Sequence, residues 1–540
     1  MSTVTLIFFG LIGLLVGFLV LVAIYDVIQS KHTILRNFPV VGHLRYILEG
    51  IGPELRQYIV TSNNQERPFS RDERSWVYAS SKKQNNHYGF GTDNLFELEP
   101  NYLIIKHSGF PYNAPRRKPG VLPTIECSKV WGAARGRAKA FRPESTIFIS
   151  AMSYGSLSAP AVESLNRGAA MARCMHNSGE GSVTPHHGHG GDIIWQIGTG
   201  YFGCRDEEGN FNLEKLKKVI ARYPVRALEI KISQGAKPGH GGVLPMAKIT
   251  EEIAEIRGIP RDRDCVSPAG HSEFSNIDEM LDFVEMLGQE TGLPVGIKSA
   301  VGQLDFWVEL AELMADGTRG VDFITIDGGE GGTGAAPLAF SDHVSYPFKV
   351  GFPRVYREFA LRGLTDKIVF VGSGRLGFPQ SALLAHALGC DMIAIAREAM
   401  LAIGCIQAQR CHTNKCPAGI ATQNKWLMRG LDPTHKSVRF ANYALNLQYE
   451  IMELAYACGV PHPSLVTLEH FDILGEDFSA RSARDVFGYE PQWALPPKAE
   501  QERIWAEAKK NQEAAKASAG VPAARIAMSE TTEAEPIPAE

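Results

Sequence analysis

Three cysteines lie close together in the last third of the chain. Cys405, Cys411 and Cys416 are separated by five and four residues, and Pro417 follows directly. The spacing fits a structural zinc site poorly, because Cys-x-x-Cys pairs and a matching histidine pair are both missing. Thiolates in one loop ahead of a proline are typical of iron–sulfur ligation. The loop 405–416 therefore predicts a three-iron cluster or a four-iron cluster with an open corner, with three free cysteines as the alternative.

Glycine and basic residues after two apolar runs predict a phosphate site. Gly372, Ser373 and Gly374 end one run, and Arg397 follows the next. Backbone N–H groups in such loops bind phosphate at the last two strands of a barrel. A phosphorylated cofactor is therefore expected, and Lys231 at the end of an earlier run adds positive charge that suits a reduced flavin.

The histidines in the stretch TPHHGHGG at residues 184–191 are a second candidate metal group. No cysteine or carboxylate accompanies them at ligand spacing. A loop that covers a flavin or faces solvent is the alternative interpretation.

The elements that position these residues are apolar runs separated by helical patterns. Continuous apolar runs indicate strands of a parallel sheet that is covered on both faces. Eight such units favour an α/β fold of the (β/α)8 TIM barrel type over a doubly wound sheet, and the carboxyl ends of the strands then form the active face. The eight runs are TIFIS, CMHNS, ALEIKIS, CVSPA, PVGIKS, FITID, IVFVG and MIAIA.

The two ends of the chain differ from its centre. Residues 4–24 are apolar and uncharged, which predicts a transmembrane helix, and Lys31 and Arg36 after it place the rest in the cytoplasm. A cleaved secretory signal is the alternative. We expect a short N-terminal end at 1–3, the helix at 4–24, a small lead-in region at 37–140, the barrel at 141–470 and a helical, then disordered, tail at 500–540.

Composition excludes some function classes. A formal net charge of -4 gives no general attraction to nucleic acid. The nine cysteines are odd in number and mostly isolated, which favours a reducing compartment over a disulfide scaffold.

From about residue 146 to about residue 469 the chain resembles the FMN-binding synthase domain of glutamate synthase. The motif with the cysteines resembles that family's 3Fe-4S cluster loop. The motifs that carry the resemblance are SAMSYGSLS at 150–158, NSGEG at 177–181, QIGTGYFG at 196–203, IKISQGAKPGHGG at 230–242, DGGEGGTGAAP at 327–337 and CIQAQRCHTNKCPAGIATQ at 405–423.

The resemblance implies an FMN across the barrel mouth and an oxidoreductase acting on CH–NH2 donors. Electrons would enter through the cluster from a redox donor protein, either a ferredoxin or an NAD(P)H-dependent reductase, and FMN would reduce the imine of 2-oxoglutarate and ammonia to glutamate. Lys237 and Arg257 would face the carboxylates of the 2-oxo acid. The implied FMN contacts are Ala151, Met152, Ser153, Gln196, Lys231, Gly374 and Arg397.

The chain also departs from the family pattern. His240 stands for a glutamate, Val243 for a glutamine and Ser272 for a histidine, and the start MST lacks the family's N-terminal cysteine nucleophile. We therefore expect free ammonia or a separate glutaminase to supply nitrogen to a single-pass membrane enzyme with a cytoplasmic catalytic domain. The alternatives are a membrane-bound electron-transfer flavoprotein and an FMN dehydrogenase of another amino or hydroxy acid.

Overall fold

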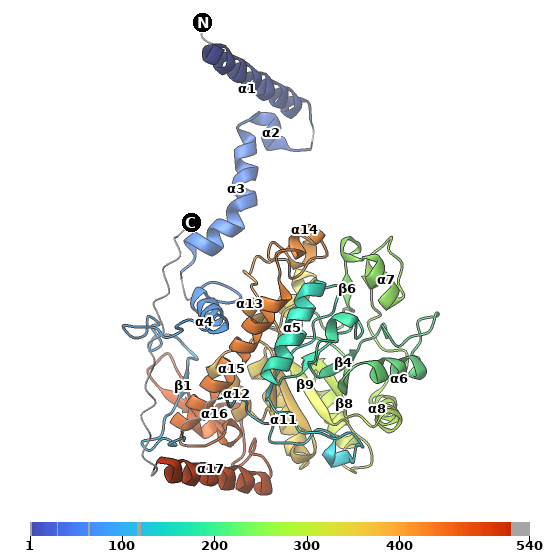
Figure 1. The fold of residues 1–540 in the computed structure, drawn as a ribbon, viewed down its shortest axis with the longest axis vertical. Coiled ribbons are helices and arrows are strands. Elements are labelled where there is room, and N and C mark those ends of the chain that lie inside the picture. The colour runs from blue at the N-terminus through green and yellow to red at the C-terminus, as the bar shows by residue number, and fades with distance from the viewer. Residues whose placement is uncertain (1–2, 30, 63–64, 116–119, 520–540) are drawn as a thin grey trace. The chain divides into compact units, whose positions relative to one another are not determined.

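The computed structural model describes residues 3–29, 31–62, 65–115 and 120–519. It divides into two compact units, residues 1–75 and residues 76–540 (Figure 1). The expected tail beyond residue 519 lies outside the described residues, and the boundaries of the expected lead-in and barrel regions stay predictions.

The N-terminal unit is helical. It contains α1 (Thr3–Ile28), α2 (Thr33–Asn37), α3 (Gly42–Leu55) and the π-helical turn η1 (Arg56–Val60). Among the described residues, α1 is the one helix long and apolar enough to cross a membrane, by length and composition alone. A signal sequence would have the same properties, so α1 is a candidate span.

The second unit contains a closed barrel of eight parallel strands in the order β10-β11-β2-β3-β4-β5-β8-β9. This confirms the barrel and excludes the doubly wound sheet. The strands are β2 (Ile147–Ile149), β3 (His176–Asn177), β4 (Ile193–Ile197), β5 (Val225–Lys231), β8 (Val295–Ala300), β9 (Phe323–Asp327), β10 (Val369–Ser373) and β11 (Met392–Ile395).

One of the eight expected strands is wrong. The run CVSPA forms β7 (Cys265–Val266), which pairs antiparallel with β6 (Val243–Leu244) in a separate ribbon outside the barrel. The fully buried run IIWQI, β4, takes its place in the barrel. Cys265 is half-buried and Val266 is exposed, so this run lacks the two covered faces that a barrel strand requires.

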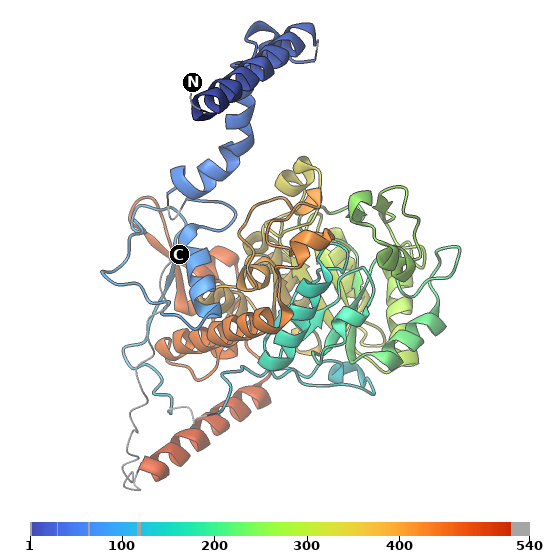
Figure 2. The same cartoon turned by 45° about the horizontal axis from the view of Figure 1, so that its top comes forward.

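Helices cover the outside of the barrel. Two of the largest, α5 (Ala159–Ala172) and α15 (Pro433–Ala457), lie side by side (Figures 1 and 2). They approach so closely that a Cβ on Gly168 would lie 2.6 Å from the Ser437 carbonyl oxygen. The others that flank the strands are α6 (Leu213–Arg222), α8 (Ile277–Thr291), α9 (Asp305–Leu313), α11 (Phe348–Ala360), α12 (Pro379–Ala387) and α13 (Arg397–Ala402).

The amino-terminal end of the barrel is filled by apolar side chains. Trp131 is fully buried, and its ring centroid lies 4.2 Å from that of Phe323 on β9. Cys127, Phe148 and Val371 belong to the same core cluster. Because this end is packed shut, the polar residues at the opposite end define the open mouth of the barrel.

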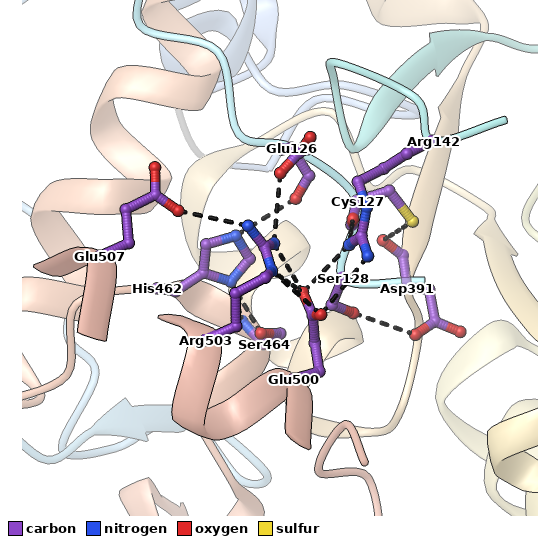
Figure 3. A network of polar contacts seen from close by, with 10 residues as sticks. All are labelled: Glu126, Cys127, Ser128, Arg142, Asp391, His462, Ser464, Glu500, Arg503 and Glu507. Carbon is purple, nitrogen blue, oxygen red and sulfur yellow. Dashed lines mark hydrogen bonds and ion pairs between the residues drawn. The ribbon is translucent and has the colours of Figure 1, made fainter. Parts of the chain in front are cut away.

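The C-terminal helix α17 (Lys498–Ala519) is fastened by charged contacts to the segment that enters the barrel (Figure 3). Glu500 accepts a hydrogen bond from Arg142 at 3.0 Å, and Arg503 bonds to both Glu500 at 2.6 Å and Glu126 at 3.2 Å. Arg142 also donates to the Cys127 carbonyl at 2.7 Å. The tail helix is therefore tied to the closed end of the barrel, away from its mouth.

Two fully buried histidines should make the fold sensitive to acid. Burial lowers the pKa of His176 to about 3 and that of His386 to about 4. Below pH 6.5 the unfolded chain gains protons that the folded chain does not, so stability is present above that pH and is lost as the pH falls. Each histidine should cost roughly 1–2 kcal/mol of unfolding free energy between pH 7 and pH 5. Denaturation of His386→Gln and wild-type protein at both pH values checks this, since an unchanged pH dependence would contradict the assignment.

Candidate functional site

A buried carboxylate forms the floor of the barrel mouth. Glu229 on β5 accepts hydrogen bonds from the amides of Asn177 at 2.8 Å and Gln196 at 2.6 Å. Its second oxygen accepts from the Thr325 hydroxyl at 2.8 Å. The side-chain amide of Gln196, a predicted cofactor contact, is therefore held in place from below, because buried polar groups require such partners.

An ion pair lies above this floor, in a pocket between the strand ends. Lys231, at the end of β5, contacts Glu180 at 3.1 Å and donates to Gln234 at 2.6 Å. Burial favours the neutral acid of Glu180, but the charges of Lys231, Arg257 and Lys237 outweigh it and lower its pKa. Glu180 is therefore a carboxylate.

Lys237 also lines this pocket. Its ammonium donates to the Ala335 carbonyl at 2.8 Å and is almost completely buried. Burial, and then the charge of Lys231, lower its pKa to about 8, so a proton can leave or return near neutral pH. The pocket is lined by Glu180, Thr199, Lys231, Ile232, Ser233, Gln234, Lys237, Gly239, His240, Gly241, Gly242, Pro268 and Ala269.

Arg257 lies elsewhere. It ends α7 (Glu251–Arg257), and its buried guanidinium donates to the Tyr154 carbonyl at 2.8 Å and to the Ser153 hydroxyl at 3.3 Å. The same group lies over the ring of Phe202 at 5.1 Å. Burial is the main cause that lowers the pKa of the Arg257 guanidinium. The structure thus places Arg257 behind the loop that follows β2, where it supports Ser153, and it does not line the pocket that contains Lys237.

Asp327, at the end of β9, joins four strand-end loops. One carboxylate oxygen accepts from the Gly235 N–H at 3.0 Å and lies 3.3 Å from the Lys298 ammonium. The other accepts from the Ser373 hydroxyl at 2.7 Å. The loops after β5 and β9 touch closely, since a Cβ on Gly235 would lie 1.9 Å from the Gly328 carbonyl oxygen.

The predicted phosphate loop contains an anion position that one of the chain's own carboxylates occupies. Glu330 accepts the N–H of Phe348, in the first turn of α11, at 2.8 and 3.1 Å. Gly374 has φ +137°, and a Cβ there would lie 3.3 Å from the Glu330 carboxyl carbon. Arg397 donates to the Glu330 carbonyl. A helix N-terminus, a glycine turn and an arginine therefore meet where a phosphate would fit.

The loop after β2 is joined to the cysteine loop by buried polar contacts. Lys248, 2% exposed, donates to the Ser156 carbonyl at 2.7 Å and to the Cys411 carbonyl at 3.1 Å. Gln423 donates to the carbonyls of Gly155 at 3.1 Å and Leu157 at 2.8 Å. The predicted flavin contacts Ala151, Met152 and Ser153 thus lie in a loop that is contiguous with the predicted cluster loop.

The structure gathers two of the three cysteines. Cys411 lies in the short 3-10 turn η6 (Cys411–Thr413), near Cys416, and both interact electrostatically with the Lys248 ammonium. In the part of the chain that the structure describes, no three His, Cys, Asp or Glu side chains gather closely enough to hold a metal ion. The three cysteines therefore do not form such a group in the described residues, although all three lie in one loop.

A family model described as the conserved region in glutamate synthase matches residues 128–461. The chain belongs to the glutamate synthase family. The match spans both the barrel mouth and the cysteine loop. It confirms the predicted family and the predicted enzyme class, an oxidoreductase acting on CH–NH2 donors.

Individual members of the glutamate synthase family support this assignment. The glutamate synthase large subunit-like protein YerD of Bacillus subtilis is 37% identical over 502 residues, which cover 87% of this chain and 95% of that protein. The archaeal glutamate synthase [NADPH] of Methanocaldococcus jannaschii is 36% identical over 327 residues, and the chain spans 59% of its length. A solved structure of a flavocytochrome b2 mutant with pyruvate bound is 14% identical, with a TM-score of 0.40, and the match covers 79% of this chain and 91% of that protein's chain.

The histidines at residues 186–189 do not form one group in this family member. His186 contacts Glu252 at 2.9 Å, whereas the buried His187 contacts Thr184 at 2.9 Å. Their partners lie on different elements, so among the described residues the metal alternative has no support.

Sequence reasoning missed four residues that organise the site: Glu180, Glu229, Asp327 and Lys248. Three of them left a signal in the sequence, because Glu229 lies within a mostly buried strand, Asp327 ends another, and Glu180 lies in the NSGEG motif. Lys248 left no signal in the sequence, since only the folded chain shows that its ammonium group is buried.

Proposed function

We propose that this glutamate synthase family member is an FMN- and iron–sulfur-dependent enzyme that converts 2-oxoglutarate and ammonia to glutamate. The observation that carries the proposal is the pocket with Lys231 and Lys237 at the barrel mouth, together with the polar position at Glu330 and Gly374 on the loops after β9 and β10. When bound, FMN would supply the hydride, and a 3Fe-4S cluster on the three cysteines would carry electrons to it.

The residues of the pocket have roles that follow from their charges. Lys237 would attract a carboxylate of a 2-oxo acid, and Lys231 would face the flavin, while Glu180 offsets one of the two positive charges. With a pKa of about 8, the Lys237 ammonium can give a proton to the hydroxyl group that leaves as the imine forms. Gln196, Ser153, the loop Gly372–Ser373–Gly374 and Arg397 would hold the cofactor.

The site residues fit the phosphate end of FMN better than they fit the iron–sulfur cluster. The phosphate end of FMN fits well, because the Phe348 N–H and the Gly374 turn surround the Glu330 carboxyl group, and Arg397 bonds to the Glu330 main-chain carbonyl. The donor set of three thiols in one loop suits a three-ligand cluster, although the three side chains would have to approach one another to hold it.

The experiment uses the full chain in detergent, purified and reduced without oxygen. Addition of 2-oxoglutarate with ammonium should restore the oxidised flavin spectrum and produce glutamate, whereas either compound alone should not. If the flavin stays reduced, the assignment of substrate is wrong. Reoxidation by a carrier protein would then favour the electron-transfer alternative, and reoxidation by another 2-oxo acid would favour the dehydrogenase alternative.

We also propose that α1 is a single-pass anchor with the catalytic unit in the cytoplasm. Lys31 and Arg36 follow the apolar helix, as the positive-inside bias requires. Nitrogen would come from free ammonia or a separate glutaminase, and electrons from a ferredoxin or an NAD(P)H-dependent reductase. Intact N-terminal sequence on the membrane-bound protein distinguishes an anchor from a cleaved signal.

A further inference from the structure

Helix α3, outside the catalytic unit, has one exposed apolar face. Its apolar side chains recur at intervals of three and four residues, which places them on one side of the helix. All of them are between 38% and 57% exposed, and they are Leu44, Ile47, Leu48, Ile51 and Leu55. On the opposite side, Arg45 and Glu49 form an ion pair at 2.9 Å. The helix is thus amphipathic, and its apolar face is partly exposed.

The start of α3 is tied to the end of α1. Asp26, in the last turn of α1, is completely buried, and its carboxylate accepts the Val40 N–H at 2.9 Å and contacts the His43 ring at 2.9 Å. Gly42 packs so closely on α2 that a Cβ there would lie 3.1 Å from the Leu35 side chain. The chain therefore turns sharply at α2, and α3 does not continue the line of α1 (Figures 1 and 2).

The contacts of Asp26 with Val40 and His43 fix the depth of the start of α3 relative to the candidate transmembrane helix α1. A charged residue at the end of a 26-residue apolar helix lies at the edge of the hydrocarbon core, because its carboxylate is costly inside it. His43, in the first turn of α3, is held at that same level. The apolar face of α3 consequently begins at the membrane boundary and not at a distance from it.

We propose that α3 lies on the lipid surface as a second membrane contact, with the face formed by Leu44, Ile47, Leu48, Ile51 and Leu55 at the boundary between headgroups and acyl chains. The proposal rests on the proposed anchoring by α1. Lipid is the occupant that the structure favours over a second copy of the chain, because the face starts level with the span and basic residues flank it. These residues are Arg36 and Arg56, which suit headgroup phosphates.

The test compares a position within the apolar face of α3 with an adjacent position outside that face, in the full chain. Leu48→Trp and Glu49→Trp variants are reconstituted into phosphatidylcholine vesicles with or without bromine on the acyl chains, and the signal of the seven native tryptophans in wild-type protein is subtracted. The added fluorescence of Leu48→Trp should fall about twofold or more in brominated vesicles, and that of Glu49→Trp should change little. Flotation of the vesicles after an alkaline wash reports the anchor separately.

The outcomes separate the two proposals. Flotation without quenching of Leu48→Trp overturns the lipid contact of α3 and leaves the anchor intact. Equal quenching at both positions also overturns it, because the helix would then be immersed and not lie on the surface. Failure to float removes the anchor and the surface contact together. Quenching at residue 48 alone, in vesicles that float, supports the proposal.

Discussion

Replacement of Cys411 by serine should remove nearly all iron from the protein and leave the barrel folded. Cys411 lies in the half-buried turn η6, on a loop that follows α13 and contributes nothing to the core cluster at the closed end of the barrel. A serine hydroxyl is a poor iron ligand at neutral pH, whereas a thiolate is the ligand that iron–sulfur clusters use. Loss of one of only three ligands should lower the iron content by roughly tenfold or more.

Iron per chain, flavin per chain and circular dichroism are measured together on this variant. Cys265→Ser is the matched control, because Cys265 is also half-buried but lies on the ribbon strand β7, outside the cysteine loop. The control should keep its iron. Retention of iron in Cys411→Ser would contradict the cluster assignment, and collapse of the whole fold would contradict the view that the loop is separate from the core.

The structure also bears on how the cluster loop and the flavin loop are coupled. Lys248 bonds to one carbonyl in each, and Asn414 donates to the Ala247 carbonyl beside it at 2.6 Å. Loss of iron from Cys411→Ser should therefore loosen the loop after β2 more than the rest of the barrel. Weaker flavin retention in that variant, at unchanged helical content, would follow from these contacts.

The barrel could be predicted from the sequence because its strands are buried on both faces. Seven of the expected runs form barrel strands, and the wrong one, at Cys265, is a short apolar run in an exposed ribbon. Composition alone does not separate the two, since burial depends on what the rest of the chain places over each face. The run IIWQI was not predicted as a strand because it directly follows a glycine- and histidine-rich loop.

The site could be predicted only in part. Loop residues such as Lys237 and Ser373 stand out because polar groups follow apolar strands, and the structure brings them to one end of the barrel. Their partners are distant in sequence: Asp327 contacts Gly235 across 92 positions, and Lys248 contacts Cys411 across 163. Such pairs arise from closure of the barrel and leave no local pattern. The position of Arg257 behind Ser153 was likewise not predictable.

Asp327→Ala should destabilise the protein and abolish flavin retention together. Removal of the carboxylate leaves the buried Lys298 ammonium without its counter-charge and the Gly235 N–H without its acceptor. Breaking a buried pair on one side costs about 3–5 kcal/mol of unfolding free energy. The loop after β5, which carries Lys237, and the ends of β8 and β10, which carry Lys298 and Ser373, would lose their common anchor. Flavin content and the midpoint of thermal unfolding are the measurements.

Two further variants separate charge from position in this prediction. Asp327→Asn keeps an acceptor of the same shape without the charge, so its loss of stability and of flavin should be intermediate. Asp322→Asn is the matched control at the opposite end of β9, where Asp322 accepts from Arg137 at 2.9 Å and from the Val295 N–H at 2.8 Å. It should lower stability yet retain flavin, because it lies at the closed end of the barrel. Equal flavin loss in Asp322→Asn and Asp327→Ala would show that general destabilisation, and not the anchoring of the mouth loops, decides cofactor retention.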